Sequence, residues 1–347
     1  MVRVIQVGLG LWGLNWAEEV FPQVPDAEIV ALVDPSDDAL ERARAVLGVE
    51  PGRCYHGLAE AAAAAPADLV VATVRTQAHH PVVMEALSLG LHALVEKPFA
   101  STLAEAREMI ASADNRGRVL MVNQNYRFHP APIYVAGLVA REALGPVNMV
   151  SVDFRRHGPS QGYRYWDMPH PLLADMSIHH FDLMRMVLGS NPKRVSCRTW
   201  NPGNTPFVHD PLGVATIEFE DETMVSYRGS WISGGENTPW AGEWSMDCGE
   251  GEIWWTSRDQ SAGRPPGPDR VTIKRLGEAA TEPALPIVAL ADRAGALNAM
   301  LTALATGTPP PRFSSGRDNI MSLALVESSI LSASRRGDWV EVAELLG

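Results

Sequence analysis

Short apolar runs alternate with amphipathic stretches through the first third of the chain. Runs typical of buried strands occur at residues 2–7, 27–33, 69–72, 92–95 and 119–122. Stretches with helical periodicity lie between them, at residues 14–20, 37–47, 58–65, 81–89 and 103–112. Strands that alternate with helices in this way predict a doubly wound parallel sheet with helices on both faces.

The pattern changes after residue 122. Segments that alternate apolar and polar residues, as half-buried strands do, occur at residues 147–154, 194–199, 214–220, 224–231 and 252–255. Helical periodicity returns at residues 133–142, 174–188, 292–306 and 317–335, and residues 261–269 indicate a loop. We therefore predict an α/β domain at residues 1–122 and an α+β domain at residues 123–347. The second domain is expected to be a mostly antiparallel sheet with helices on one face.

The first predicted strand runs directly into a glycine-rich turn, Gly8-Leu9-Gly10-Leu11-Trp12-Gly13. This is the pattern G-x-G-x-x-G between a strand and a helix, and Asp34 ends the next strand. The first glycine permits a tight turn, the second lets backbone approach a diphosphate, and the third allows close packing of helix on strand. The acid would accept hydrogen bonds from the adenosine ribose. We therefore predict that residues 1–122 bind a dinucleotide.

Lys97 follows the apolar run that ends at Val95 and precedes Pro98. Ligands of open α/β sheets bind beyond the carboxyl ends of the strands, which is where we expect Lys97. Pro98 biases the backbone of Lys97 towards an extended conformation, which restricts the direction of the lysine side chain. An arbitrary Lys-Pro pair would be interpreted as a surface turn, and the residues around this pair favour a functional role.

A second candidate element lies in the predicted helix 174–188. Asp175 and His179 are four residues apart and share one helical face with Asp182. A carboxylate one turn from an imidazole fixes its tautomer and raises its basicity, as proton transfer requires. The alternative is an ordinary solvated contact on a helix surface.

The segment Gly90-Leu91-His92-Ala93-Leu94-Val95-Glu96-Lys97-Pro98 resembles the core motif of the glucose–fructose oxidoreductase/inositol dehydrogenase/rhizopine catabolism (Gfo/Idh/MocA) family. The resemblance is strong over residues 1–128, good over 174–189 and weak in the last 150 residues. It implies a Rossmann domain and catalytic roles for Lys97, Asp175 and His179. It also implies that Glu96 contacts the nicotinamide ribose.

Further site residues follow from the same resemblance. Thr73 and Thr76 are expected to contact the cofactor. The spacing to His79 is one residue longer than in the family, so His79 is either a cofactor contact or a packing residue at the entry of a helix. Asn125 and Arg127 match positions that face cofactor and substrate.

The stretch 155–170 combines arginines, histidines and aromatic residues. Arg155, His157 and Trp166 are candidate contacts for a polyhydroxylated ligand, because aromatic faces and bidentate donors suit such molecules. An ordinary surface loop or a subunit interface is an equal alternative for any one of them.

The net charge of −12 makes nucleic acids and anionic membranes poor partners. Cys54, Cys197 and Cys248 are widely spaced, so we expect neither a disulfide framework nor a metal site. The chain opens with a strand rather than a signal peptide, and no apolar run approaches the ~20 residues that span a bilayer. These features favour a cytoplasmic protein.

Together the residues and the resemblance predict an NAD-dependent dehydrogenase of a secondary alcohol in a sugar, cyclitol or related polyol. NAD is favoured over NADP because Asp34 would repel a 2′-phosphate, although Arg42 and Arg44 follow in the next helix. Two alternatives are a redox-neutral glycoside-cleaving enzyme that uses NAD and a non-catalytic sensor of nucleotide and sugar. The sensor is disfavoured because Lys97 and His179 are both present.

We also expect a homodimer or homotetramer, formed through the open face of the second sheet. The basis for this expectation is a group of tryptophans that such a face would expose: Trp231, Trp240, Trp244, Trp254 and Trp255.

Overall fold

The computed structural model describes residues 1–158, 166–259 and 267–346. It divides into two compact units, residues 1–125 with 290–320 and residues 126–289 with 321–347. This division differs from the sequence prediction of one boundary at residue 122. The segment 290–320 packs with the first unit, where the Val122 amide donates to the Ser314 carbonyl at 2.8 Å and Met121 bridges Ser315.

The first unit contains a six-stranded parallel sheet with the strand order β3-β2-β1-β4-β5-β6. Its strands are β1 (Val2–Val7), β2 (Ala27–Val33), β3 (Cys54–Tyr55), β4 (Leu69–Ala72), β5 (His92–Val95) and β6 (Leu120–Val122). The order reverses between β1 and β4, which is the switch point where ligands of such sheets bind. The doubly wound α/β fold is therefore confirmed.

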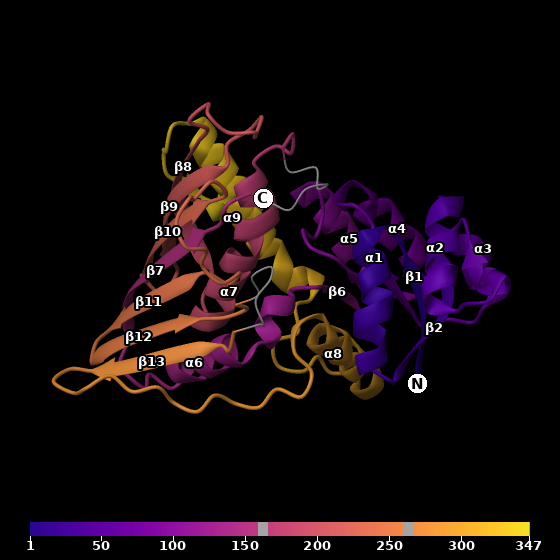
Figure 1. Ribbon diagram of the computed structural model, residues 1–347, viewed down its shortest axis with the longest axis horizontal. Helices are drawn as coiled ribbons and strands as arrows, with labels where there is room; N and C mark the ends of the chain where they lie inside the picture. Colours follow the sequence, from indigo (N-terminus) through magenta and orange to yellow (C-terminus); the bar gives the residue numbers. More distant parts are fainter. Residues whose placement is uncertain (159–165, 260–266, 347) are drawn as a thin grey trace. The chain divides into compact units, whose positions relative to one another are not determined.

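The helices of this unit are labelled in Figure 1. They are α1 (Leu11–Asn15), α2 (Asp37–Leu47), α3 (Leu58–Ala64), α4 (Thr76–Ser88), α5 (Leu103–Asn115) and α8 (Asp292–Thr306). The predicted helix 14–20 is in fact α1 followed by a π-helical segment, Trp16–Val20. Prediction placed the start of α4 at Pro81, which instead lies inside the helix. The proline removes one backbone hydrogen bond, and His79 anchors the turn before it through contacts with two loops.

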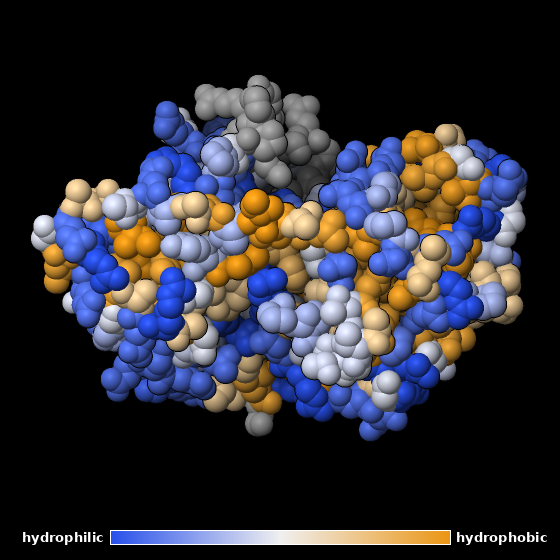
Figure 2. Space-filling view, turned by 90° about the horizontal axis from the view of Figure 1, so that it is seen from below, coloured by the Kyte–Doolittle hydropathy of each residue, from blue (hydrophilic) through white to orange (hydrophobic). Residues whose placement is uncertain are grey.

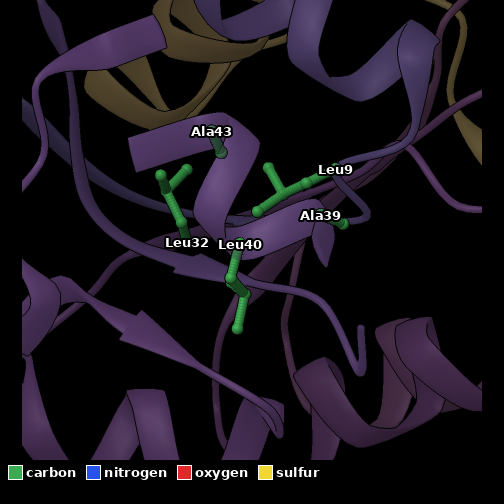
Figure 3. Close-up of a cluster of buried hydrophobic side chains, with 5 residues drawn as sticks. All are labelled: Leu9, Leu32, Ala39, Leu40 and Ala43. Carbon is green, nitrogen blue, oxygen red and sulfur yellow. The ribbon is translucent and has the colours of Figure 1, made fainter. Parts of the chain in front are cut away.

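A small apolar cluster fixes α2 against the sheet (Figure 3). It consists of Leu9, Leu32, Ala39, Leu40 and Ala43, all of them buried. Ser36 begins the helix, because its hydroxyl accepts a hydrogen bond from the Ala39 amide. The cluster includes a residue of the glycine-rich turn, so packing of α2 also holds the start of the predicted dinucleotide site.

The second unit contains an eight-stranded sheet with the order β13-β12-β11-β7-β10-β9-β8-β14. Its strands are β7 (Val147–Arg155), β8 (Pro192–Trp200), β9 (Leu212–Phe219), β10 (Met224–Ser230), β11 (Glu243–Cys248), β12 (Gly251–Thr256), β13 (Arg270–Arg275) and β14 (Val340–Glu341). All neighbours are antiparallel except β7 and β10. The mostly antiparallel sheet is confirmed, and the consecutive strands β9 and β10 form a hairpin.

Helices cover one face of this sheet, as Figure 1 shows for α6 and α7. The elements are α6 (Pro130–Ala140), a π-helical segment Leu172–Ser177, α7 (Ile178–Leu188) and α10 (Val342–Leu346), with α9 (Gly316–Ser334) shared between the two units. Gly213 and Gly229 leave room for Leu172, because a Cβ on Gly229 would lie 2.8 Å from the Leu172 side chain. The π-helical segment therefore lies against the middle of the sheet.

The two faces of the sheet differ sharply along β7. Val150, Val152 and Phe154 are buried beneath the helices, whereas Ser151 and Asp153 point to the open face. The expectation of tryptophans exposed on the open face is wrong for three of the five, whereas the half-buried Trp254 does lie there beside Ser151 and Ser245. Trp231, Trp244 and Trp255 are at most 1% exposed, and the cross-strand partner of Trp244 is the buried Val152.

Several strands escaped prediction, namely β3, β11, β13 and β14. Two of them have only two residues, which is too short for any periodicity. In β11 and β13 the apolar residues Trp244, Met246, Val271 and Ile273 alternate with polar ones, so the signal was present in the sequence. Residues 159–165 and 260–266, which include most of the predicted loop 261–269, lie outside the described part of the chain.

On the face shown in Figure 2 hydrophobic residues are interspersed with hydrophilic ones. Large exposed side chains include Leu11, Val208 and Ile287. Such scattered exposure is ordinary for folded proteins. Within the described residues, no helix has both the length and the apolar character needed to cross a bilayer.

His180 is a buried histidine with a structural role. Its Nε2 lies 3.0 Å from the Trp240 carbonyl oxygen, so this nitrogen carries the proton, and Nδ1 accepts a hydrogen bond from the Tyr227 hydroxyl at 3.1 Å. Complete burial lowers the pKa of His180 to about 4. The imidazole is therefore neutral in the folded protein at physiological pH.

This burial predicts an acid-dependent loss of stability. Between the folded pKa of about 4 and the usual value near ~6.5, the unfolded chain binds one more proton at this residue. Stability should therefore be full above pH ~6.5 and decrease by about 3 kcal/mol towards pH ~4. His180→Gln lacks this titration, so its free energy of unfolding, measured with denaturant, should fall by about 3 kcal/mol less than that of the wild type across this pH range. Equal pH slopes in both proteins would contradict the assignment.

Candidate active site

The glycine-rich turn is held by contacts that leave no room for side chains at two of its three glycines. Gly8 has a φ of +96°, and a Cβ on Gly13 would lie 1.9 Å from the Gly8 carbonyl oxygen. Thr73 closes the turn from β4, because its hydroxyl donates to the Gly8 carbonyl at 2.7 Å. Thr73 therefore supports the turn from behind.

Gly10 has different surroundings. A Cβ at this position would meet nothing within 4 Å, so the protein itself does not require glycine there. A diphosphate that approaches the backbone does require it. Asp34 lies nearby at the end of β2, where its two carboxylate oxygens accept hydrogen bonds from the Leu9 and Ser36 amides at 2.7 and 2.9 Å. These residues fit a dinucleotide cofactor.

Lys97 lies directly after β5, as predicted, and neighbouring loops hold its segment in place. His79 is almost fully buried and contacts the carbonyl oxygens of Pro98 at 2.8 Å and Val74 at 3.2 Å. Burial lowers the pKa of His79. The contacts match the packing role rather than the cofactor contact that prediction also allowed, since both ring nitrogens face backbone.

The sequence offers a further argument about Lys97. Three of the 29 basic residues are lysines, and Lys193 and Lys274 lie on strands of the second unit. The first unit thus contains one lysine, and that lysine is found beyond the carboxyl end of β5, a parallel strand flanked by β4 and β6. Such a distribution favours a chemical role over a general surface role.

Glu96 is buried beside Lys97 and accepts several hydrogen bonds. Its donors are the indole nitrogens of Trp12 and Trp16 and the side-chain amide of Asn123, at 2.7 to 2.9 Å from Oε1. The contact of Glu96 with a ribose, which the family resemblance implied, remains a prediction.

The remaining predicted cofactor contacts differ in exposure. Leu11 is 89% exposed and Trp12 46% exposed. Thr76 is half-buried at the first position of α4. Asn125 is buried, and its amide donates to the carboxylate of Asp292, at the start of α8.

In the second unit His179 is the second residue of α7, and its ring is stacked on Tyr126. The ring centroids are 4.0 Å apart and the planes differ by 6°. The guanidinium of Arg258 lies 4.3 Å from the centre of the same tyrosine ring. Tyr126 thus contacts both the His179 imidazole and the Arg258 guanidinium through its ring. The stack fixes the plane of the imidazole.

Asp175 belongs to the π-helical segment before α7, which the regular helical pattern did not predict. The rule that residues four apart lie one above the other applies to regular α-helices and does not extend across this junction. Asp175 and His179 are both buried, at 6% and 5% exposure. Their proposed pairing therefore stays a prediction.

Arg127 forms a buried ion pair within the second unit. Its guanidinium donates two hydrogen bonds of 2.6 Å to the carboxylate of Asp182, which also accepts from the Ser322 hydroxyl at 3.1 Å. These contacts indicate a structural role for Arg127 rather than the expected position facing a substrate. Bidentate pairing of two buried charges holds α7 to the segment before α6.

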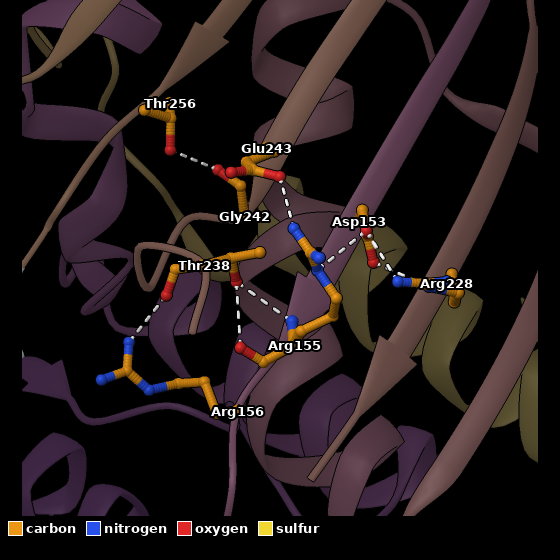
Figure 4. A network of polar contacts seen from close by, with 8 residues as sticks. All are labelled: Asp153, Arg155, Arg156, Arg228, Thr238, Gly242, Glu243 and Thr256. Atoms are coloured by element: carbon orange, nitrogen blue, oxygen red, sulfur yellow. Dashed lines mark hydrogen bonds and ion pairs between the residues drawn. The ribbon is translucent and has the colours of Figure 1, made fainter. Parts of the chain in front are cut away.

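Arg155 lies on the wrong face of the sheet for the role predicted. Its guanidinium pairs with Asp153 and Glu243 at 3.0 and 2.7 Å on the open face (Figure 4). His157 is exposed and is also displaced from the buried face. Trp166 packs edge-on against Phe207 with centroids 4.8 Å apart. Tyr163, Arg164 and Tyr165, which belong to the same stretch 155–170, lie outside the described residues.

Arg156 is the arginine that points to the helix-covered side, whereas the sequence analysis singled out its neighbours Arg155 and His157. It is 7% exposed, stacks on Trp240 at 3.8 Å and donates to the Thr238 carbonyl at 2.9 Å. Burial lowers the pKa of Arg156. Strict alternation along β7 would have found it, because Phe154 and Arg156 share one face.

Among the described residues no group of three or more His, Cys, Asp or Glu side chains is placed to hold a metal ion. The parallel sheet and the glycine-rich turn define a dinucleotide-binding Rossmann domain. Residues 2–124 match the model described as "Oxidoreductase family, NAD-binding Rossmann fold", and residues 133–253 match the "GFO/IDH/MocA C-terminal domain". The chain belongs to the Gfo/Idh/MocA family.

Named relatives cover most of the chain. A D-apiose dehydrogenase of Paraburkholderia graminis is 29% identical over 98% of this chain and 89% of its own. A myo-inositol 2-dehydrogenase of Thermotoga maritima is 26% identical over 56% of this chain and 57% of its own.

Solved structures share the fold. An oxidoreductase from Agrobacterium radiobacter, in complex with NAD+, L-tartaric acid and magnesium, has a TM-score of 0.86 at 21% identity and 99% coverage of both chains. An inositol dehydrogenase homologue from Azotobacter vinelandii, with NADH and myo-inositol, has a TM-score of 0.80 at 20% identity, covering 98% and 97%.

The different surroundings of Gly10 and Gly13 give a paired prediction. Gly13→Ala should lower the free energy of unfolding by about 3 kcal/mol, because its Cβ overlaps the Gly8 carbonyl oxygen. Gly10→Ala should leave the thermal midpoint unchanged and weaken NAD binding about tenfold or more. Calorimetry and fluorescence titration measure the two effects. A Gly10→Ala protein with unaltered NAD affinity would show that the diphosphate binds elsewhere.

Proposed function

We propose that this protein is an NAD-dependent dehydrogenase that oxidises a secondary alcohol of a sugar, cyclitol or related polyol. The observation that carries the proposal is the arrangement of one sheet. The glycine-rich turn follows β1 and Lys97 follows β5, so both lie at the carboxyl ends of strands in the same parallel sheet. The named relatives that act on D-apiose and inositol support this substrate class.

In the proposed mechanism His179 accepts the proton of the substrate hydroxyl as a general base. Lys97 stabilises the developing alkoxide by its charge and its hydrogen-bond donors. Asp175 orients or tunes His179. NAD, when bound, supplies the hydride acceptor, and Gly8, Gly10, Gly13 and Asp34 would hold it. The stack of His179 on Tyr126 supports a fixed base, since a locked ring keeps its nitrogen directed.

The proposal is tested by incubating the protein with NAD or NADP and a panel of sugars and cyclitols that includes D-apiose and myo-inositol. Formation of reduced nicotinamide, read as absorbance, supports the proposal. NAD should be the more efficient oxidant, because the Asp34 carboxylate would repel the 2′-phosphate of NADP. Substrate consumed without net reduced cofactor would instead favour redox-neutral cleavage.

Replacement of the two central residues separates chemistry from binding. Lys97→Met removes a charge and keeps bulk, and His179→Asn removes the proton acceptor. Each should lower kcat by about 100-fold or more while NAD affinity changes little. The loss of activity at low pH in the wild type should disappear in His179→Asn. A parallel collapse of NAD binding would mean that these residues only hold the cofactor.

We further propose that the protein acts in the cytoplasm as a homodimer or homotetramer through the open face of the second sheet. This face carries both signs of charge, because Asp153 pairs with Arg155 and Arg228 and Glu243 lies beside them (Figure 4). A shallow pocket of about 320 Å³ lies among these residues. Mixed charges on one face suit a self-complementary, two-fold contact.

Light scattering tests this assembly. The wild type should have a mass of two or four times 37.7 kDa at micromolar concentration. Arg228→Glu should shift it towards the monomer, since it places a third acidic group beside Asp153 and Glu243. Arg42→Glu on the exposed face of α2 makes the same charge change elsewhere and should leave the mass unaltered. A monomeric wild type would refute the proposal.

A further inference from the structure

The carboxylate of Glu96 is the meeting point of several segments of the first unit. It is 5% exposed, and Oε1 accepts hydrogen bonds from Trp12 at 2.8 Å, Trp16 at 2.7 Å and Asn123 at 2.9 Å. Its other oxygen accepts from the backbone amide of Lys97 at 3.2 Å. Hydrogen bonds to an ionised acceptor are stronger than neutral ones, so this set holds its members firmly.

These donors come from different strand ends. Trp12 belongs to the glycine-rich turn after β1 and Trp16 follows that turn, whereas Asn123 follows β6 and Glu96 itself follows β5. In the sheet β4 lies between β1 and β5. A single carboxylate therefore ties the turn that is proposed to hold the cofactor to the backbone of the lysine that is proposed to act on the substrate.

Arg293 adds a second layer to this arrangement. It lies in the first turn of α8, and its guanidinium is 4.3 Å from the centre of the Trp12 ring and 5.7 Å from that of Trp16. Its Nη2 donates to the side-chain oxygen of Asn15 in α1 at 2.6 Å. A cation over the indole faces and an anion at their N–H edges are both favourable, so the tryptophans are held between opposite charges.

We propose that Trp12 and Arg293 are positioning residues for hydride transfer, which act through Glu96 on the backbone of Lys97. The proposal rests on the proposed dehydrogenase function. Three donors hold one carboxylate oxygen of Glu96 in place, and the other oxygen accepts the hydrogen bond from the Lys97 amide. Glu96 therefore serves as the anchor of Lys97. Trp12 and Arg293 fix that anchor from the side of the cofactor turn. The stabilised lysine then presents its ammonium group in one orientation.

The variants are Trp12→Phe, which removes the indole N–H and keeps an aromatic ring, and Arg293→Met, which removes the cation and keeps the chain length. Trp339→Phe is a matched control. Trp339 is 43% exposed against 46% for Trp12, and the Arg194 guanidinium lies 4.8 Å from its ring. Trp339 resembles Trp12 in its exposure and in its contact with an arginine. It lies in the second unit and donates no hydrogen bond to Glu96.

Steady-state kinetics provide the first measurement. Trp12→Phe and Arg293→Met should each lower kcat about tenfold, because one charge-assisted contact is lost. The affinity for NADH, measured by fluorescence, should stay within about twofold, because the glycine turn keeps its own contacts. The deuterium isotope effect on kcat should increase as the chemical step becomes slower. Trp339→Phe should match the wild type in all three quantities.

Acylation of lysine provides a second measurement that needs no activity. Because the chain has three lysines, mass spectrometry can follow Lys97 beside Lys193 and Lys274 as internal references. In both variants an acetylating reagent should modify Lys97 faster, as its backbone is less restrained, while the reference lysines keep their rates. This measurement also distinguishes failure of the proposed function from failure of the present proposal. A wild type without dehydrogenase activity would overturn the proposed function, and the acylation rates of Lys97 would still test whether Trp12 and Arg293 restrain its backbone.

Two outcomes overturn the proposal. If NADH affinity falls in proportion to kcat, Trp12 and Arg293 are cofactor contacts rather than positioning residues. If the acylation rate of Lys97 is unaltered in both variants, they do not restrain it, whatever happens to activity. Should Trp12→Phe fold poorly, the same criteria apply to Arg293→Met, whose side chain is only half-buried.

Discussion

A carboxylate that becomes buried on folding must be surrounded by hydrogen-bond donors of the protein, and this constraint shapes the first unit around Glu96. The donors are two indoles, one amide and one backbone N–H, which come from the ends of β1, β5 and β6. Packing alone would accept smaller side chains than Trp12 and Trp16 beside the glycine-rich turn. Satisfying a buried charge demands donors at fixed positions, and so it links the end of β1 to the ends of β5 and β6, neither of which is next to β1 in the sheet.

The second unit is organised by the alternation of its strands. Arg155 and Arg156 are adjacent in the chain, yet one pairs with acids on the open face and the other stacks on Trp240 beneath the helices. A shift of one residue exchanges the faces completely. The same alternation leaves the open face charged and puts three of the tryptophans into the core. It also brings the aromatic and cationic groups to the side on which His179 stacks with Tyr126.

The first unit could largely be predicted from sequence because its signals are local. Strand, glycine turn, helix and Asp34 follow one another within a few dozen residues, and each imposes a conformation. The return of residues 290–320 could not be predicted, since a helical pattern does not tell which sheet it packs on. The contact of Arg293 with Asn15 joins residues 278 positions apart. In the second unit the π-helical segment at Asp175 broke the regular spacing on which its pairing with His179 was predicted.

The use of basic residues in this chain gives a last argument about Lys97. Arginine forms bidentate pairs inside each unit, with Asp68, Asp182 and Asp153 as partners. Its planar fork suits a carboxylate, whereas the ammonium of lysine is a compact charge whose three donors can rotate towards one oxygen. An alkoxide that develops during hydride transfer presents one oxygen and no plane. A chain that otherwise relies on arginine thus places lysine where a single oxygen must be stabilised, and an arginine at position 97 would deliver its charge in the wrong shape.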